Sequence, residues 1–153
     1  MSLALTPAIS HAGAVDRLIK ASGPSIYYVR EDQKRFAFPN AATYKSWYED
    51  FSTVENVNNQ ALSNYPLIGN VTYRPGKRLV KITTDPKVYA VAHGGILRWI
   101  QTEAVARALY GDSWAQQIDD IPDGFFANYQ IGAPIISEND YNRTEELHNA
   151  YSI

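Results

Sequence analysis

The stretch that decides the fold is Val71–Ile100, VTYRPGKRLVKITTDPKVYAVAHGGILRWI. Its segment Arg78–Thr83 largely alternates between polar and apolar side chains. It is also rich in β-branched side chains, which are favoured on a half-buried pleated surface. Asp85-Pro86 then breaks the pattern, because proline has no N–H to donate to a sheet. The next run, Lys87–Val91, is predicted as a second strand.

The end of this stretch predicts a hairpin followed by a capped helix. His93-Gly94-Gly95 offers residues that accept positive φ in a tight turn, and Ile96–Ile100 returns as the third strand. Thr102 stands where its side chain accepts a hydrogen bond from an early backbone N–H of a helix over Glu103–Tyr110. Gly111 is a typical residue just past a helix C-terminus.

A weaker copy of the same pattern occurs earlier in the chain. Leu18-Ile19-Lys20 matches Leu79-Val80-Lys81, which lies 61 positions later. Further matches, 62 to 64 positions apart, pair Gly23-Pro24 with Asp85-Pro86, Tyr27 with Tyr89, Asn40 with Thr102, and Tyr65 with Tyr129. A repeat of this size indicates supersecondary units that stack on each other.

The duplication predicts an α+β fold of two pseudo-equivalent repeats, each a small antiparallel sheet plus a short helix, packed on a shared core. Each unit alone buries too little apolar surface to offset its chain entropy. The predicted boundaries are an N-terminal arm or linker at 1–14, repeat one at 15–70, repeat two at 71–137 and an acidic tail at 138–153. The expected core comprises Ile26, Tyr28, Phe36, Phe38, Trp47, Val88, Val91, Trp99, Ile100, Leu109, Trp114 and Phe125.

An aromatic stripe marks the helix predicted in repeat one. Tyr44, Trp47 and Tyr48 are three and four positions apart and therefore share one helix face. Packing of this face against the hairpin is the favoured interpretation, because such stripes are usually buried. The alternative is an exposed platform on which sugar rings stack.

Composition narrows the functional classes. The 153 residues are 45% hydrophobic and 20% charged, which is typical of a folded chain of one domain or two small ones. The absence of cysteine excludes disulfides, thiol nucleophiles and zinc–thiolate sites. No apolar run has the length of a membrane span, so no membrane insertion is expected.

Charge is unevenly distributed along the chain. Residues 71–107 carry seven basic and two acidic side chains, whereas residues 108–153 carry one basic and eight acidic ones. The net charge of −2 argues against a nucleic-acid partner, because phosphate binders are usually basic. We expect the basic and acidic segments to neutralise each other in the fold.

Motifs for catalysis are missing. The histidines, His11, His93 and His148, are far apart and fit no metal-ligand spacing, and the chain has neither a GxSxG elbow nor a phosphate-binding glycine loop. The sequence therefore predicts no catalytic residue, no metal ligand and no cofactor.

One acidic segment, Asp119–Gly124, resembles a calcium loop. It fails the EF-hand pattern, because Ile121 stands at the third position and Gln130 at the twelfth, where a bidentate carboxylate is needed. A looser calcium site that includes Asp112 remains an alternative. The same carboxylates are the candidates for a hydrolase: Asp112, Asp119, Asp120 and Asp123.

Several phrases carry a resemblance to a known type of domain. NVTYRPG, LVKITTDPKVYAV, LRWI, ALYG and IDDIPDGFFANYQIG, with the weaker RFAFPNAATYKSWY, resemble an uncharacterised tandem-repeat domain of exported or cell-surface multidomain bacterial proteins. The resemblance covers Leu18 to Ile136. It implies an extracellular or cell-surface accessory module beside other domains, and it transfers no catalytic motif.

These observations favour a non-catalytic surface module that binds a glycan or a surface protein, or that serves as a structural spacer. The candidate ligand-binding residues are Tyr73, Tyr89 and Trp99, since tyrosine and tryptophan combine a large apolar ring with a polar group. Two alternatives stay open. One is a hydrolase of cell-wall polysaccharide or peptidoglycan that uses the clustered aspartates, and the other is a calcium-dependent self-assembling scaffold. The sequence leaves the oligomeric state open.

Overall fold

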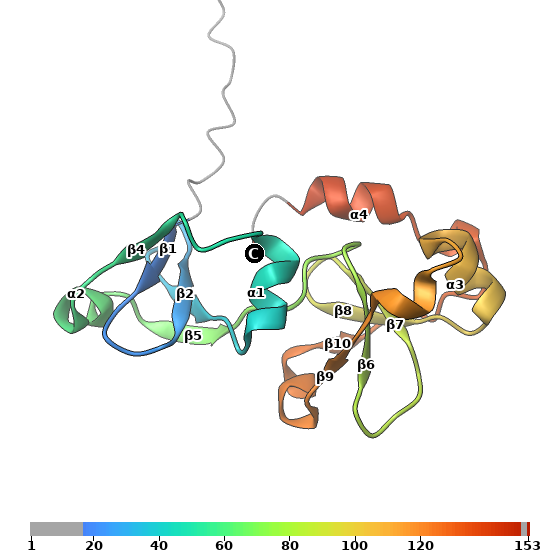
Figure 1. The fold of residues 1–153 in the computed structure, drawn as a ribbon, viewed down its shortest axis with the longest axis horizontal. Helices are drawn as coiled ribbons and strands as arrows, with labels where there is room; N and C mark the ends of the chain where they lie inside the picture. Colours follow the sequence, from blue (N-terminus) through green and yellow to red (C-terminus); the bar gives the residue numbers. More distant parts are fainter. Residues whose placement is uncertain (1–16, 151–152) are drawn as a thin grey trace, which may run out of the picture.

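Two five-stranded sheets, each accompanied by short helices, form the fold. The computed structural model describes residues 17–150 and 153. Figure 1 shows the two sheets side by side, with the first repeat coloured blue to green and the second yellow to orange. The predicted arm at residues 1–14 lies outside the described residues.

Repeat one contributes five strands and two helices. In chain order they are β1 (Arg17–Lys20), β2 (Ile26–Val29), β3 (Arg35–Ala37), α1 (Ala41–Trp47), β4 (Val54–Asn56), α2 (Asn59–Ser63) and β5 (Leu67–Asn70). The strand order in the sheet is β4-β1-β2-β3-β5. β1, β2 and β3 pair antiparallel, whereas the outer strands β4 and β5 pair parallel to their neighbours.

Repeat two has the same layout. Its elements are β6 (Leu79–Ile82), β7 (Tyr89–Ala92), β8 (Ile96–Trp99), α3 (Glu103–Tyr110), η1 (Trp114–Gln117), β9 (Ile118–Ile121), η2 (Asp123–Asn128) and β10 (Gln130–Ile131). The strand order is β9-β6-β7-β8-β10, again with three antiparallel central strands and parallel outer ones. The α+β class and the two pseudo-equivalent units are thus confirmed.

Strand register reproduces the alignment read from the sequence. Leu18 pairs with Val54 in repeat one, and Leu79 pairs with Ile118 in repeat two. Across the hairpins, the pair Ile19–Tyr27 corresponds to the pair Val80–Tyr89. Because a slip of one residue would move every side chain to the other face of a sheet, agreement in register is strong evidence for a structural duplication.

The three central strands of each sheet pair antiparallel as expected, but the added outer strands make both sheets mixed. After the third strand of each repeat the chain passes through a helix before it returns to the sheet, and such a crossover allows the returning strand to run parallel. Val54–Asn56 and Ile118–Ile121 follow these helices in the chain. These two short segments form the parallel strands β4 and β9.

The caps and turns form where the residue types predict them. The side chain of Asn40 accepts from the backbone N–H of Thr43 at the start of α1, and that of Thr102 accepts from Val105 at the start of α3. Gly94 and Gly95 adopt φ values of 79° and 72° in the second hairpin. A side chain rarely tolerates this backbone conformation, so glycine is needed there.

The hydrophobic core differs in one respect from the expected one. All twelve expected residues belong to hydrophobic clusters, but the described residues form three clusters rather than one shared core. One cluster lies between the first sheet and α1, another between the second sheet and α3, and the third covers the opposite face of the second sheet. The repeats therefore stand side by side and do not bury one face against each other (Figure 1).

The aromatic stripe of α1 is part of the first of these clusters. Tyr44 is buried, and Trp47 and Tyr48 pack against the same cluster. The Trp47 indole N–H donates to the Thr72 carbonyl at 2.8 Å, so the helix also holds the segment that leads into repeat two. The packing interpretation is confirmed for these side chains.

The C-terminal segment folds back over the second repeat. It contains η3 (Glu138–Asp140) and α4 (Arg143–Asn149), which lies above the second sheet in Figure 1. Tyr141 lies between these two helices in the chain, and its hydroxyl donates to the Val91 carbonyl at 2.8 Å. The Arg143 guanidinium bonds the Gly76 carbonyl at 2.8 Å and lies 4.3 Å from the Tyr110 ring centroid.

Helices in the described part of the chain are short. None of them is long and apolar enough to cross a bilayer.

Candidate binding site

A surface pocket of about 320 Å³ lies in repeat one, between the turn that follows β1 and the start of α1. Its walls are mostly apolar and include two prolines and three aromatic rings. The lining residues are Pro24, Ser25, Ile26, Phe38, Pro39, Asn40, Ala41, Tyr44 and Phe51. Concave, mainly apolar sites of this kind are the usual places where proteins bind ligands.

Repeat two carries a pocket of about 200 Å³ at the equivalent place. Its lining residues are Pro86, Lys87, Val88, Trp99, Ile100, Gln101, Thr102, Glu103, Ala106 and Trp114. Pro24 corresponds to Pro86, and the helix caps Asn40 and Thr102 correspond to each other. Two pockets at matching positions follow directly from the duplicated architecture, because each combines the same turn, strand and helix start.

An aromatic side chain after the helix closes each pocket. The Phe51 ring stacks on Tyr44, with centroids 4.8 Å apart and planes 19° from parallel, and Phe51 remains 53% exposed. Burial raises the pKa of the Tyr44 hydroxyl, which donates to the Asp50 carbonyl at 2.7 Å. Trp114 takes the corresponding place in repeat two and is partly buried against the cluster that contains Ala106, the residue equivalent to Tyr44.

The side-chain oxygens of two rim residues, Asn40 and Thr102, are already engaged in helix capping. Asn40 Oδ1 accepts from the Thr43 backbone N–H at 2.8 Å and from the Thr43 hydroxyl at 3.0 Å. Thr102 Oγ1 accepts from the Val105 N–H at 3.2 Å. The pockets therefore offer apolar and aromatic surface more than free hydrogen-bonding groups.

The three ligand-binding residues expected from the sequence come together in the structure, in the cluster on the second face of the second sheet. Tyr73 and Tyr89 are 2% and 5% exposed, so their rings pack in the interior. The Tyr73 hydroxyl donates to Asp119 at 3.0 Å, and burial together with this carboxylate raises the pKa of Tyr73. Trp99 is partly buried and lines the pocket of repeat two, where the Lys87 ammonium lies 5.1 Å from its ring centroid.

The aspartates considered for hydrolysis or calcium binding each contact a different partner. Asp119 pairs with Arg78 at 2.8 Å, and Asp120 pairs with Lys81 at 2.8 Å. Their neighbouring positions on β9 direct them to opposite faces of the sheet. Asp123 accepts from the Thr84 hydroxyl at 3.0 Å, and Asp112 lies 3.4 Å from Arg107. Within residues 17–150 and 153, no group of three acidic or histidine side chains is arranged to hold a metal ion.

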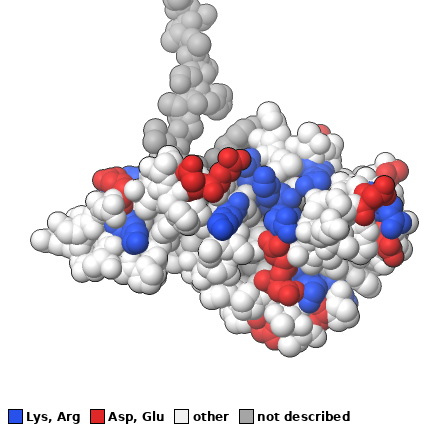
Figure 2. Space-filling model, in the orientation of Figure 1, with Lys and Arg blue, Asp and Glu red and all other residues white. Residues whose placement is uncertain are grey.

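These contacts also account for the uneven charge of the sequence. Arg78 and Lys81 from the basic segment pair with Asp119 and Asp120 from the acidic one. Figure 2 shows a group of basic side chains near the middle of the visible face, with acidic side chains directly beside it. The expectation of neutralisation within the fold holds for these pairs.

Sequence reasoning missed most of the pocket. Phe51 and Trp114 each lie four positions after the last residue of a helix, Trp47 of α1 and Tyr110 of α3. Their correspondence was a usable signal, since each is a large aromatic residue in a polar surrounding. The position of the pocket itself depends on how turn, strand and helix meet in space.

Comparison with family models, curated proteins and solved structures gives no significant match for this chain.

Proposed function

We propose that this chain is a non-catalytic binding module whose two repeats each present one apolar pocket to a protein partner. The single observation that carries the proposal is the occurrence of the same pocket in both repeats. Few residues lining the two pockets are identical, yet each keeps a proline in the turn and a large aromatic side chain after the helix. Two sites on one chain strengthen binding to a partner that has two matching segments.

A peptide segment fits these pockets better than a glycan does. Sugar recognition needs free polar groups beside a stacking ring, and the side-chain oxygens of the caps Asn40 and Thr102 already accept hydrogen bonds from their helices. Prolines and aromatic rings together form the kind of surface on which proline-containing or apolar peptide segments dock. The expected occupant is therefore a large apolar side chain of an extended segment.

The setting that we propose is an accessory module of an exported or cell-surface bacterial protein. The resemblance of the repeat phrases to such domains supports this location. A non-catalytic role is supported by the separate partners of Asp112, Asp119, Asp120 and Asp123, since hydrolysis of a glycosidic bond uses two carboxylates that face one cleft.

Selection of peptides from a displayed random library against the folded chain tests the proposal. The selected peptides are expected to bind Phe51→Ala at least tenfold more weakly than the parent chain. Leu67→Ala is the matched control, because Leu67 is also 53% exposed but lies on β5, outside the pocket. Peptides that bind both variants as well as the parent, or a library that yields no binder, would overturn the proposal.

A further inference from the structure

The two pockets differ at the end that faces the outer strand β4 or β9. In repeat one, a second hollow of about 380 Å³ adjoins the first and shares Pro24, Ile26 and Phe51 with it. Lys20 and Asn56 line this extension, and they are register partners on β1 and β4. The groove of repeat one therefore continues from an aromatic ring to an ammonium group.

In repeat two the equivalent strand positions carry an ion pair. Lys81 and Asp120 are register partners on β6 and β9, as Lys20 and Asn56 are on β1 and β4. The Lys81 ammonium lies 2.8 Å from Asp120 Oδ1. Among the described residues, by contrast, no carboxylate forms an ion pair with Lys20. At this end, asparagine against aspartate leaves Lys20 available and occupies Lys81. Lys87 also lines the pocket of repeat two, but its ammonium lies 5.1 Å from the Trp99 ring centroid, and the carboxylate-bearing Glu103 lines the same pocket.

We infer that repeat one selects a segment in which a carboxylate stands next to a large apolar side chain, whereas repeat two accepts the apolar side chain alone. This inference rests on the proposed function and adds the chemistry of the partner. The apolar group occupies the pocket beside Phe51, and the carboxylate reaches Lys20 in the adjoining hollow. Ion pairs at a partly exposed rim are weak, so the carboxylate is expected to improve affinity about two- to fivefold.

Two small probes that share an apolar part and differ in their terminal group, one neutral and one anionic, test the apolar pocket and the charge selection separately. 3-Phenylpropanol and 3-phenylpropionate share the same ring and chain, and binding of each is followed at both pockets through backbone amide shifts in two-dimensional NMR. Both probes are expected to shift amides of both repeats. Only repeat one is expected to bind the carboxylate more tightly than the alcohol.

Reciprocal substitutions provide the decisive comparison. Asn56→Asp builds in repeat one the ion pair of repeat two, and it is expected to abolish the preference for the carboxylate without weakening the alcohol. Asp120→Asn frees Lys81 and is expected to create the preference in repeat two. Both positions are at the surface and the NMR spectrum reports directly whether each variant is folded.

The outcomes test the charge selection and the apolar pocket separately. Equal affinity of repeat one for both probes, or a preference that survives Asn56→Asp, would overturn the charge selection and leave the apolar pocket in place. The absence of amide shifts at either pocket with both probes would overturn the proposed function and the charge selection together.

Discussion

The two repeats fill the same core position in different ways. In repeat one, Tyr28 and Tyr44 point into the space between sheet and helix, and both are 1% exposed. The equivalent residues in repeat two are Ala90 and Ala106, which are equally buried. The cluster around these alanines contains instead Tyr141, which belongs to the C-terminal segment.

This difference teaches that a duplicated backbone does not require a duplicated core. Interiors are packed at nearly constant density, so two missing rings must be replaced by other atoms or leave a cavity. Repeat two recruits the replacement from outside the repeated unit, and the hydrogen bond from Tyr141 to the Val91 carbonyl fixes its position. The C-terminal segment is consequently a structural part of repeat two.

Removal of the Tyr141 ring is expected to lower the stability of the fold more than any other change proposed for the two repeats. Tyr141→Ala is expected to cost about 3–5 kcal/mol of unfolding free energy, because a large cavity opens beside Ala90 and Ala106. Tyr141→Phe keeps the ring and loses one hydrogen bond, at a cost of about 1 kcal/mol. Urea denaturation measures both values. A loss below 1 kcal/mol for the alanine variant would show that repeat two is stable without the C-terminal segment.

A second test concerns the tight contact between the C-terminal segment and Gly76, which lies in the stretch 71–78 between β5 and β6. Gly76 has φ of 73°, and a Cβ there would lie 2.7 Å from the Arg143 carbonyl oxygen. Gly76→Ala is therefore expected to cost about 2–4 kcal/mol, the sum of backbone strain and overpacking.

Gly94→Ala is the matched control, since Gly94 has φ of 79° but open space around its Cβ position. It is expected to cost only the backbone strain, about 1 kcal/mol. Equal losses of unfolding free energy for the two variants in urea denaturation would contradict the close packing of the C-terminal segment on Gly76.

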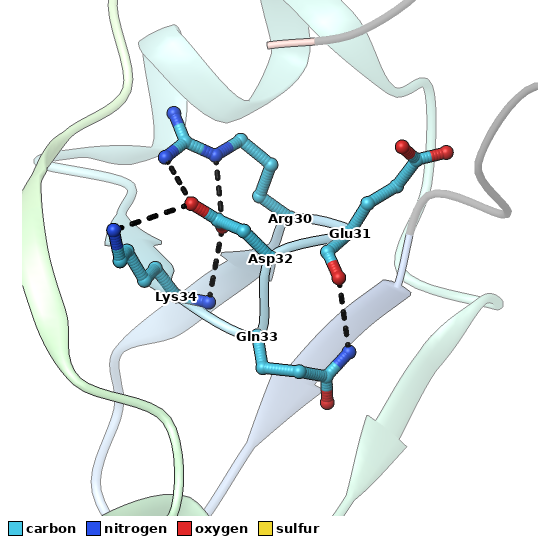
Figure 3. Close-up of polar contacts among 5 residues, drawn as sticks. All are labelled: Arg30, Glu31, Asp32, Gln33 and Lys34. Atoms are coloured by element: carbon cyan, nitrogen blue, oxygen red, sulfur yellow. Dashed lines mark hydrogen bonds and ion pairs between the residues drawn. The ribbon is translucent and has the colours of Figure 1, made fainter.

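The smallest expected effect distinguishes the two hairpin turns. In repeat one the Asp32 carboxylate accepts from Arg30 Nε at 2.9 Å and lies 3.5 Å from Lys34 Nζ, as Figure 3 shows. The Arg30 guanidinium holds the pKa of Asp32 well below its ordinary value. In repeat two the corresponding turn depends on the positive φ values of Gly94 and Gly95.

The sign of the pH effect follows from this lowered pKa. The stabilisation of the first turn by Asp32 is fully present above the pKa of an unfolded aspartate, about 3.9, and is lost as pH falls through the lower folded value. An NMR titration of the Asp32 carboxyl carbon is expected to show a midpoint below 3.9, which Arg30→Gln moves upward. A midpoint at the ordinary value in the parent chain would mean that these contacts do not persist in solution.

Local patterns predicted the local features well. Asn40 and Thr102 form helix caps because a side-chain oxygen before a helix satisfies an N–H that the helix leaves free. The matching order of turns and caps also predicted the duplication, since each feature is decided by a few adjacent residues. The parallel outer strands were missed, because short segments such as Val54–Asn56 form strands only when a neighbouring strand is already in place.

The sequence by itself determined the two repeats, their turns and caps, and twelve members of the hydrophobic clusters, because these depend on backbone preferences and on the apolar character of side chains. Only the tertiary structure decided that the clusters are separate, that Tyr141 completes the second one, and that Phe51 and Trp114 face equivalent pockets. These features join residues that are distant along the chain. Their positions depend on how sheet, helix and C-terminal segment fill space together, and no local pattern carries that information.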